Sequence, residues 1–141
     1  CETDYYEHEI GPNLKRLFVS FDTLHPPDAL AGFKHETNDI EQEIAEQCAG
    51  LEISRPVNLD PGYVDLGKLV LATTKDRAHR IYIGQCMYAE ATLQFTGGIW
   101  KPGIWTYPDY LRADYHAFFV RLRNRLREQR RELADQEEPT P

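Results

Sequence analysis

Two neighbouring segments, residues 78–83 and 87–95, constrain the fold of this chain more than any other part of its sequence. In both, apolar and polar residues alternate, which is typical of strands with one buried face. A three-residue turn at 84–86 sets Ile81 opposite Ala89 and produces one apolar face, whereas a two-residue turn would mix the faces. We therefore predict an antiparallel hairpin with a three-residue turn. Its other predicted pairs are Ile83 with Met87, Tyr82 with Tyr88, His79 with Ala91 and Arg80 with Glu90.

Four patterns precede the hairpin. Residues 16–22 alternate and predict a strand, and the prolines at 26 and 27 open a helix pattern. Residues 52–60 alternate again and predict an edge strand, because Pro56 cannot donate to a ladder. Asp65 is the predicted N-cap of a short helix that continues to Thr73. The apolar positions are Leu17, Val19 and Phe21 in the first strand, Leu30, Phe33, Thr37, Ile40 and Ile44 in the first helix, Ile53, Val57 and Leu59 in the second strand, and Leu66, Leu69 and Val70 in the short helix.

After the hairpin, residues 96–98 turn the chain into a short strand at 99–100, and a last helix follows residues 107–109. Its apolar stripe is Tyr115, Phe118, Phe119, Leu122 and Leu126. Adjacent antiparallel strands interrupted by helices predict an α+β fold, with helices packed on a mainly antiparallel sheet. We expect a single domain over residues 1–133 and a disordered acidic tail over residues 134–141.

Composition excludes several classes of protein. With 41% hydrophobic residues in 141, the chain can bury a core, so it is not disordered throughout. A net charge of −7 argues against general nucleic-acid binding, which needs a basic surface. No apolar run approaches the roughly 18–20 residues that span a bilayer, so we expect no membrane partner.

The cysteines bear on the cellular compartment, and the first residue bears on whether the chain is truncated. Cys1, Cys48 and Cys86 form no CxxC pair, and such a sparse set suits a reducing, cytoplasmic environment better than a Cys48–Cys86 disulfide. The chain begins with Cys1, and Met87 is its only methionine. A truncated chain explains this better than a lipoprotein acylated at Cys1, because a structured pattern begins almost at once.

The segment from Thr73 to Arg80 is the strongest candidate site. Hydroxyls beside cations are the groups that bind phosphate or carboxylate, and the segment offers Thr73, Thr74, Lys75, His79 and Arg80. The structural alternative is more common: cations at a helix end offset the helix dipole, and Arg80 pairs with Glu90. No GxxxxGK[ST] or GxGxxG motif is present, so nucleotide binding of those kinds has no support.

Weaker candidates lie elsewhere. Asn58, Asp60 and Glu90 could meet to hold Mg²⁺ or to share a proton, although Asp60 also suits the turn that follows it. Trp105 and Tyr107 could wall a ligand pocket, but such rings more often close a core. Histidines show no metal-ligand spacing, so we predict no metal centre built on them. The last helix carries many arginines, which suit a solvated face or an acidic protein partner; they are Arg121, Arg123, Arg125, Arg127, Arg130 and Arg131.

Several segments together follow a known pattern from residue 4 to about residue 120. They include Asp4-Tyr5-Tyr6, Val57-Asn58-Leu59-Asp60-Pro61-Gly62-Tyr63, Lys68-Leu69-Val70-Leu71-Ala72-Thr73-Thr74-Lys75-Asp76, His79-Arg80-Ile81-Tyr82, Tyr88-Ala89-Glu90 and Trp105-Thr106-Tyr107-Pro108-Asp109-Tyr110. With these motifs the chain resembles a bacterial domain-of-unknown-function family, DUF4416, some of whose members carry an automatic GTP-binding label. The resemblance implies a further strand and helix before Asp4, and hence a truncated ferredoxin-like core followed by a hairpin and helix. It implies no reaction.

Two functions remain open on the sequence. The preferred one is a polar pocket for an anionic small molecule, a nucleotide or phosphometabolite, bound by Lys75, Thr74 and Arg80 with Asn58, Thr73, Tyr82, Trp105 and Tyr107 around it. Asp60, Glu90 and His79 would then be the acid–base groups, with Mg²⁺ as a conceivable cofactor. The alternative is a non-enzymatic interaction module that uses the arginine-rich helix. The sequence does not decide whether the chain is an enzyme.

Overall fold

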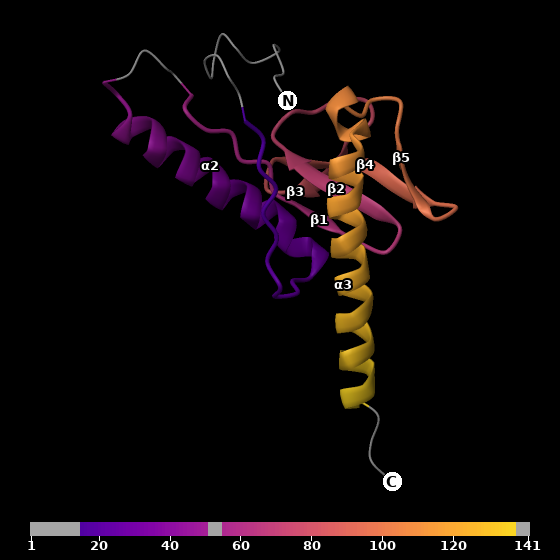
Figure 1. The fold of residues 1–141 in the computed structure, drawn as a ribbon. Helices are drawn as coiled ribbons and strands as arrows, with labels where there is room; N and C mark the ends of the chain where they lie inside the picture. The colour runs from indigo at the N-terminus through magenta and orange to yellow at the C-terminus, as the bar shows by residue number, and fades with distance from the viewer. Residues whose placement is uncertain (1–14, 51–54, 138–141) are drawn as a thin grey trace. The chain divides into compact units, whose positions relative to one another are not determined.

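The computed structural model describes residues 15–50 and 55–137 (Figure 1). Its contacts divide the chain into two compact units. Unit 1 comprises Cys1–Pro61 and Ala72–Ala89, and unit 2 comprises Gly62–Leu71 and Glu90–Pro141. Each unit is described by itself below.

Five strands form one sheet, and the fold is α+β, as predicted. The strands are β1 (Gly62–Val64), β2 (Lys68–Thr73), β3 (Ile81–Gly84), β4 (Met87–Thr96) and β5 (Ile99–Pro102). Their order is β1-β2-β4-β3, and β5 also pairs with β4. The pairs β1–β2, β3–β4 and β4–β5 are antiparallel. The ferredoxin-like arrangement remains an expectation of the resemblance alone.

The β3–β4 hairpin has the predicted register but a different turn. Ile81 pairs with Ala89 and Tyr82 with Tyr88, as expected, whereas Met87 pairs with Gly84 instead of Ile83. Two residues with positive φ form the turn, Gln85 at 52° and Cys86 at 59°. This left-handed turn matches the twist of the strands, and an irregularity between Tyr82 and Gly84 absorbs the extra residue.

The short helix predicted at 65–73 is wrong, because these residues form the turn and second strand of a β1–β2 hairpin. The Asp65 N–H donates to the Lys68 carbonyl at 2.8 Å, and the Asp65 carboxylate accepts the Leu66 N–H at 2.7 Å. Leu69 and Val70 are both buried although they point to opposite faces of β2. A short apolar run buried on both faces has no period that separates a strand from a helix.

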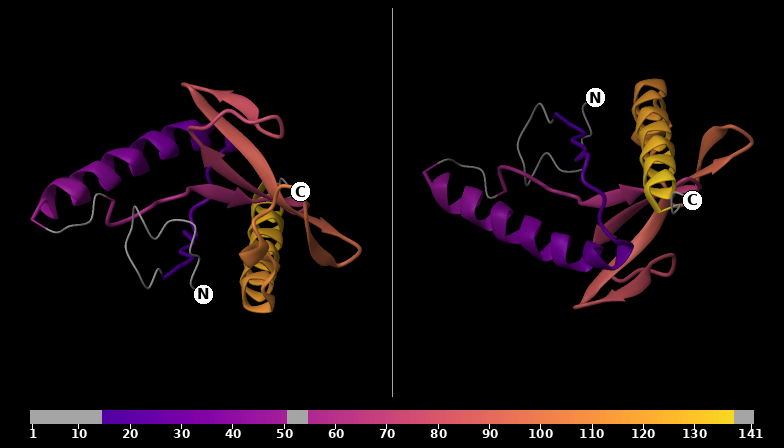
Figure 2. Two further views of the ribbon diagram at one scale, coloured as in Figure 1. Left: turned by 90° about the horizontal axis from the view of Figure 1, so that it is seen from above. Right: turned by 90° about the horizontal axis from the view of Figure 1, so that it is seen from below.

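The two strands predicted before the sheet are also wrong where the structure describes them. Residues 15–26 contain no strand, and they run as a plain trace into the first helix in Figure 1 and in both views of Figure 2. Residues 55–60 contain none either, and 51–54 lie outside the described residues. The backbone of Leu59 is bonded by side chains of the first helix instead of by a neighbouring strand: its N–H donates to Glu41 and its carbonyl accepts from Lys34. Alternation permits a strand, but only a partner strand creates one.

The first predicted helix is confirmed as α2 (Leu30–Gln47), preceded by the turn η2 (Pro27–Ala29). Pro27 occupies the first position of η2, where the missing N–H costs nothing. Leu30, Ala31 and Lys34 are the buried residues of α2. A buried lysine on the apolar side of the helix was not foreseen. Cys48 and Cys86 both carry free thiols.

The core of unit 2 is aromatic. The turn η3 (Pro108–Leu111) leads into α3 (Ala113–Glu137), the predicted last helix. Phe119 contacts Trp100 at a centroid distance of 6.2 Å and stacks on Tyr110 with an interplanar angle of 14°. The helix extends beyond Leu133, so residues 134–137 are helical instead of disordered, and 138–141 lie outside the described part. No described helix is long and apolar enough to cross a membrane.

Candidate functional site

The connection between β2 and β3, residues 74–80, holds most of the predicted anion-binding groups, and we call it the β2–β3 loop. Hydrogen bonds within unit 1 brace its backbone. The Thr73 hydroxyl accepts the Lys75 N–H at 3.2 Å, and the Arg80 guanidinium donates to the Lys75 carbonyl at 3.0 Å. The Arg80 N–H also donates to the Arg77 carbonyl at 2.9 Å. The structure therefore brings Thr73, Lys75 and Arg80 together, but Arg80 is committed to holding the loop.

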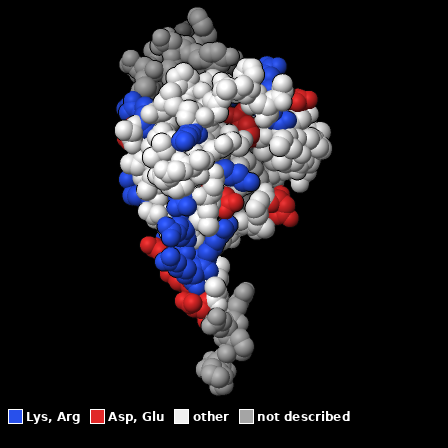
Figure 3. Space-filling view, turned by 90° about the vertical axis from the view of Figure 1, so that its right-hand side faces the viewer, with Lys and Arg blue, Asp and Glu red and all other residues white. Residues whose placement is uncertain are grey.

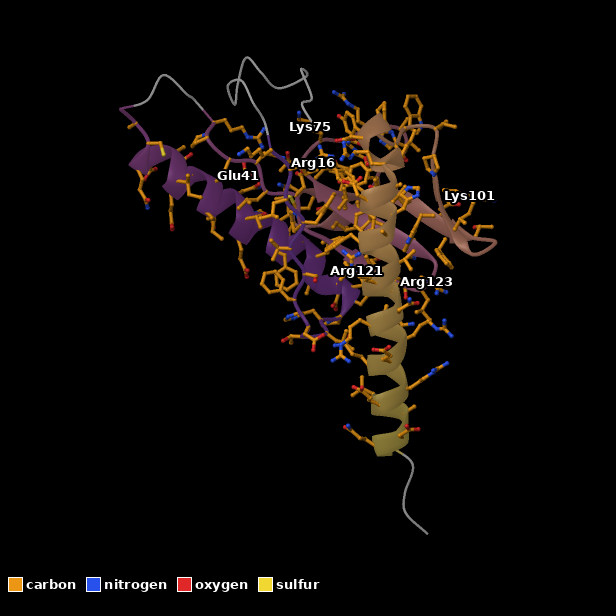
Figure 4. All side chains as sticks on the ribbon, viewed as in Figure 1. Arg16, Glu41, Lys75, Lys101, Arg121 and Arg123 are labelled. Carbon is orange, nitrogen blue, oxygen red and sulfur yellow. The ribbon has the colours of Figure 1, made fainter. Side chains whose placement is uncertain are left out.

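Two side chains of the loop are exposed cations. Lys75 and Arg77 are exposed, and neither side chain has an ion pair or hydrogen bond within the part of the chain that the structure describes. Thr74 beside them is exposed as well. Arg77 was not among the residues singled out from the sequence, although its position between two other cations was a signal for it. Figure 4 labels Lys75 in this loop.

Asp76, the one carboxylate of the loop, affects the pKa of Tyr88. Partial burial, followed by the charge of Asp76 and a hydrogen bond to it, raises the pKa of Tyr88 above its usual 10.0. Tyr82 contacts Tyr88 edge to face at 5.5 Å, and its hydroxyl accepts the Cys86 N–H at 3.3 Å. Asp76 is exposed between Lys75 and Arg77 but forms no ion pair with either of them in the described part of the chain. Tyr88 was not among the candidate site residues, but its predicted cross-strand pair with the candidate Tyr82 was a signal for it.

Asn58 and Asp60 belong to a separate polar cluster of unit 1, the Lys34 network. The Lys34 ammonium, in a residue only 4% exposed, donates to the Leu59 carbonyl at 2.7 Å and lies 3.7 Å from the Asp60 carboxylate. Glu41 on α2 (Figure 4) lies 4.0 Å from the same ammonium and 3.1 Å from Arg55.

Asn58 completes the network. Its amide donates to Asp60 at 2.8 Å, and its carbonyl oxygen accepts from Arg55. Two cations therefore face two carboxylates, Glu41 and Asp60, so the charges balance. Such an arrangement ties residues 55–60 to α2. Within residues 15–50 and 55–137, no group of three His, Cys, Asp or Glu side chains is placed to hold a metal ion.

Glu90, Trp105 and Tyr107 lie in unit 2. The Glu90 carboxylate accepts the Thr92 hydroxyl at 3.2 Å on β4. The Thr106 hydroxyl donates to the Thr92 carbonyl at 2.6 Å and thereby fixes the segment between β5 and η3 to β4. Trp105 is 59% and Tyr107 43% exposed, so they do not close the aromatic core. His79 lies half-buried in the β2–β3 loop of unit 1.

Four of the arginines of α3 divide into two groups, while Arg121 lies over the Phe118 ring and Arg125 lies near Glu128 and Glu132. The first group is already bonded within unit 2. Arg123 donates to the Leu66 carbonyl at 2.6 Å and lies 3.9 Å from the Phe95 ring, and Arg130 pairs with Asp65 at 2.8 Å. Figure 4 shows Arg121 and Arg123 on opposite sides of α3.

The second group is exposed to solvent. Arg127 and Arg131 have no ion pair among the described residues, and they line an open hollow of about 220 Å³ with Asn124 and Glu128. In Figure 3 the Lys and Arg side chains gather along α3 with acidic side chains next to them. The hollow is smaller than the roughly 300–1,000 Å³ of small-molecule pockets, so it suits a side chain of a partner better than a metabolite.

A comparison with known protein families places the chain in one of them. The family described as "Domain of unknown function (DUF4416)" matches residues 1–126, which is most of the chain and includes both the β2–β3 loop and the Lys34 network. No curated protein and no solved structure matches the chain.

Proposed function

The chain belongs to the DUF4416 family, and we propose that it binds an anionic small molecule, a nucleotide or a phosphorylated metabolite, at the β2–β3 loop. One observation supports this proposal above all others. Lys75 and Arg77 are exposed cations without a partner in the described residues, and they stand on a loop whose backbone is already braced. A braced loop loses little conformational entropy when a ligand arrives.

The chemistry of the loop fits phosphate in particular. A guanidinium offers two parallel N–H donors to phosphate oxygens, an ammonium adds a compact charge, and the hydroxyl of Thr74 can donate a further hydrogen bond. The site is open to water, so we expect binding that weakens strongly as the salt concentration rises. Tyr82 is 58% exposed on β3 and is the proposed stacking surface for a base or sugar.

Isothermal titration with inorganic phosphate, nucleoside phosphates and phosphorylated sugars tests the proposal. K75A and R77A should each weaken binding by about fivefold to tenfold, the effect of losing one charge-assisted hydrogen bond at an exposed site. K68A is the matched control, because Lys68 is an exposed lysine at the other end of β2. If the wild type binds none of these anions, or if K75A and K68A bind them with equal affinity, the proposal is contradicted.

Turnover of the bound molecule is a separate proposal. His79, which lies half-buried in the β2–β3 loop, would be the acid or base, with Mg²⁺ as the conceivable cofactor. Asp60 and Glu90 are not part of this proposal, because the Asp60 carboxylate already balances Lys34 and Glu90 belongs to unit 2. We also propose a cytoplasmic location, which the free thiols of Cys48 and Cys86 suit.

A second candidate function rests on α3. Arg127 and Arg131 could receive carboxylates of an acidic protein, which would make the chain an interaction module. Deletion of residues 110–133 is a poor test, because it would remove Tyr110, Tyr115 and Phe119 from the core. Pull-down with R127E/R131E is better, with R125E as control, because Arg125 already lies near Glu128 and Glu132. A partner lost only with R127E/R131E favours the module, and a partner retained by it contradicts this function.

A further inference from the structure

The segment from Arg16 to Asp22 exposes an apolar surface that no other part of the described chain covers. Leu17 is 83%, Val19 67% and Phe21 83% exposed, while Phe18 between them is half-buried. Three large alternating apolar side chains in water are costly, at roughly 1.5–3 kcal/mol each relative to full burial. The segment therefore has the side-chain pattern of a strand without the contacts of one.

The backbone of this segment has an open hydrogen-bonding edge. Along an extended chain, every second residue directs its N–H and C=O to the same edge. Leu17, Val19 and Phe21 share such an edge, and none of them forms a hydrogen bond within the described residues. Arg16, Phe18 and Asp22 do take part in interactions within the chain. The backbone groups of Leu17, Val19 and Phe21 are therefore available to a second strand.

The sequence of the segment is complementary to itself. In an antiparallel pair of two copies centred on Val19, Leu17 faces Phe21 and Arg16 faces Asp22 at both ends. Pairing in parallel would set Arg16 against Arg16. Moving the antiparallel register by two residues would place an apolar residue opposite Lys15 or Thr23. Only the register centred on Val19 matches both apolar residues and opposite charges.

We infer that the segment 16–22 is a dimerisation strand that pairs antiparallel with the same segment of a second copy of the chain, about a two-fold axis at Val19. Leu17, Val19 and Phe21 then form the hydrogen-bonded pairs of the two-stranded ladder, and their side chains form one apolar cluster across it. Such an isologous contact closes on itself, because the same edge of each copy is used in the pairing.

The dimer should be weak and concentration-dependent. Seven residues from each copy make a contact at the low end of specific interfaces, below about 1,200 Å². Arg16 and Asp22 already have contacts in the single chain, so their charges across the interface select the register more than they add affinity.

Sedimentation velocity from about 5 µM to about 500 µM tests the inference on the whole chain. We expect a shift from monomer to dimer with rising concentration. V19K places two like charges opposite each other at the axis and should weaken the dimer by at least about tenfold. L24K is the matched control, because Leu24 is exposed but outside the pairing, and it should dimerise like the wild type.

Charge reversal tests the register. R16D leaves two acidic ends and D22R two basic ends, so each variant alone should dimerise less than the wild type. A one-to-one mixture should form a mixed dimer, because both end pairs are then opposite in charge. Circular dichroism confirms that each variant is folded. The inference is overturned if the wild type stays monomeric at every concentration or if V19K dimerises as strongly as the wild type. It is also overturned if the mixture of R16D and D22R dimerises no more than either variant alone.

Discussion

Replacing Lys34 by methionine removes the cation at the centre of the Lys34 network and keeps an unbranched side chain of similar length. The ammonium donates to the Leu59 carbonyl at 2.7 Å and faces two carboxylates, Glu41 at 4.0 Å and Asp60 at 3.7 Å. Its loss leaves the carbonyl without this donor and Glu41 with Arg55 as its remaining cation. We expect K34M to lower the free energy of unfolding substantially.

The magnitude follows from exposure. A hydrogen bond from a charged donor is worth about 1.5–3 kcal/mol, and breaking a fully buried ion pair costs about 3–5 kcal/mol. The side chain of Asp60 is 52% exposed, so water already weakens its attraction to Lys34, whereas that of Glu41 is only 13% exposed. We therefore expect a loss of about 2–3 kcal/mol, near the hydrogen-bond value.

Urea unfolding measures this loss. With a slope of about 2 kcal/mol per molar, the midpoint should fall by about 1–1.5 M at an unchanged slope. K68M, at an exposed lysine, should change the free energy by less than about 0.5 kcal/mol. In K34M/E41Q the two losses should be less than additive, because each variant removes the same interaction. If K34M unfolds at the same urea concentration as K68M, the network does not stabilise unit 1 and the reasoning fails.

Three further predictions concern the hairpins. G62A should destabilise the chain by about 1–3 kcal/mol in thermal unfolding, because the new Cβ would meet a backbone carbonyl of β2. G32A, in contrast, has open space around the new Cβ and should stabilise α2 by about 0.5–1 kcal/mol. Equal melting temperatures of the two variants would contradict this prediction. C86G should raise the free energy of unfolding by about 1 kcal/mol, since the turn holds residue 86 at a φ of 59°; a loss of stability would show that the thiol matters. Burial and Asp76 raise the pKa of Tyr88, so D76N should move its titration, read by tyrosinate absorbance, to lower pH. Because the folded-state pKa is the higher one, this contribution to stability is present below about pH 10 and is lost as the pH rises through the folded-state value; a titration unchanged in D76N would remove Asp76 as a cause.

The β3–β4 hairpin shows what local pattern can predict. The pairs Ile81–Ala89 and Tyr82–Tyr88 follow from side-chain alternation, because a shift of one residue would exchange the two faces. The turn length did not follow, because the irregularity between Tyr82 and Gly84 changes the count of residues without changing the faces.

The candidate site shows the same division. Thr73, Lys75 and Arg80 lie close in sequence, so their convergence on one loop was foreseeable. Lys34 and Asp60 come together across 26 positions of sequence, and no periodicity announces such a contact. The lysine was a weak signal in itself, because it lies one turn after Leu30 on the apolar side of α2.

By itself, the sequence determined the elements whose period and turn residues are local: α2, α3 and the β3–β4 and β4–β5 hairpins. Tertiary structure alone decided whether an alternating segment becomes a strand, since hydrogen bonds must find a partner that local sequence does not contain. Residues 16–22 and 55–60 alternate like strands yet form none, whereas the apolar run after Asp65 pairs with β1 and forms a strand. The physical reason is that side-chain patterning is a property of one segment, whereas a sheet is a property of two.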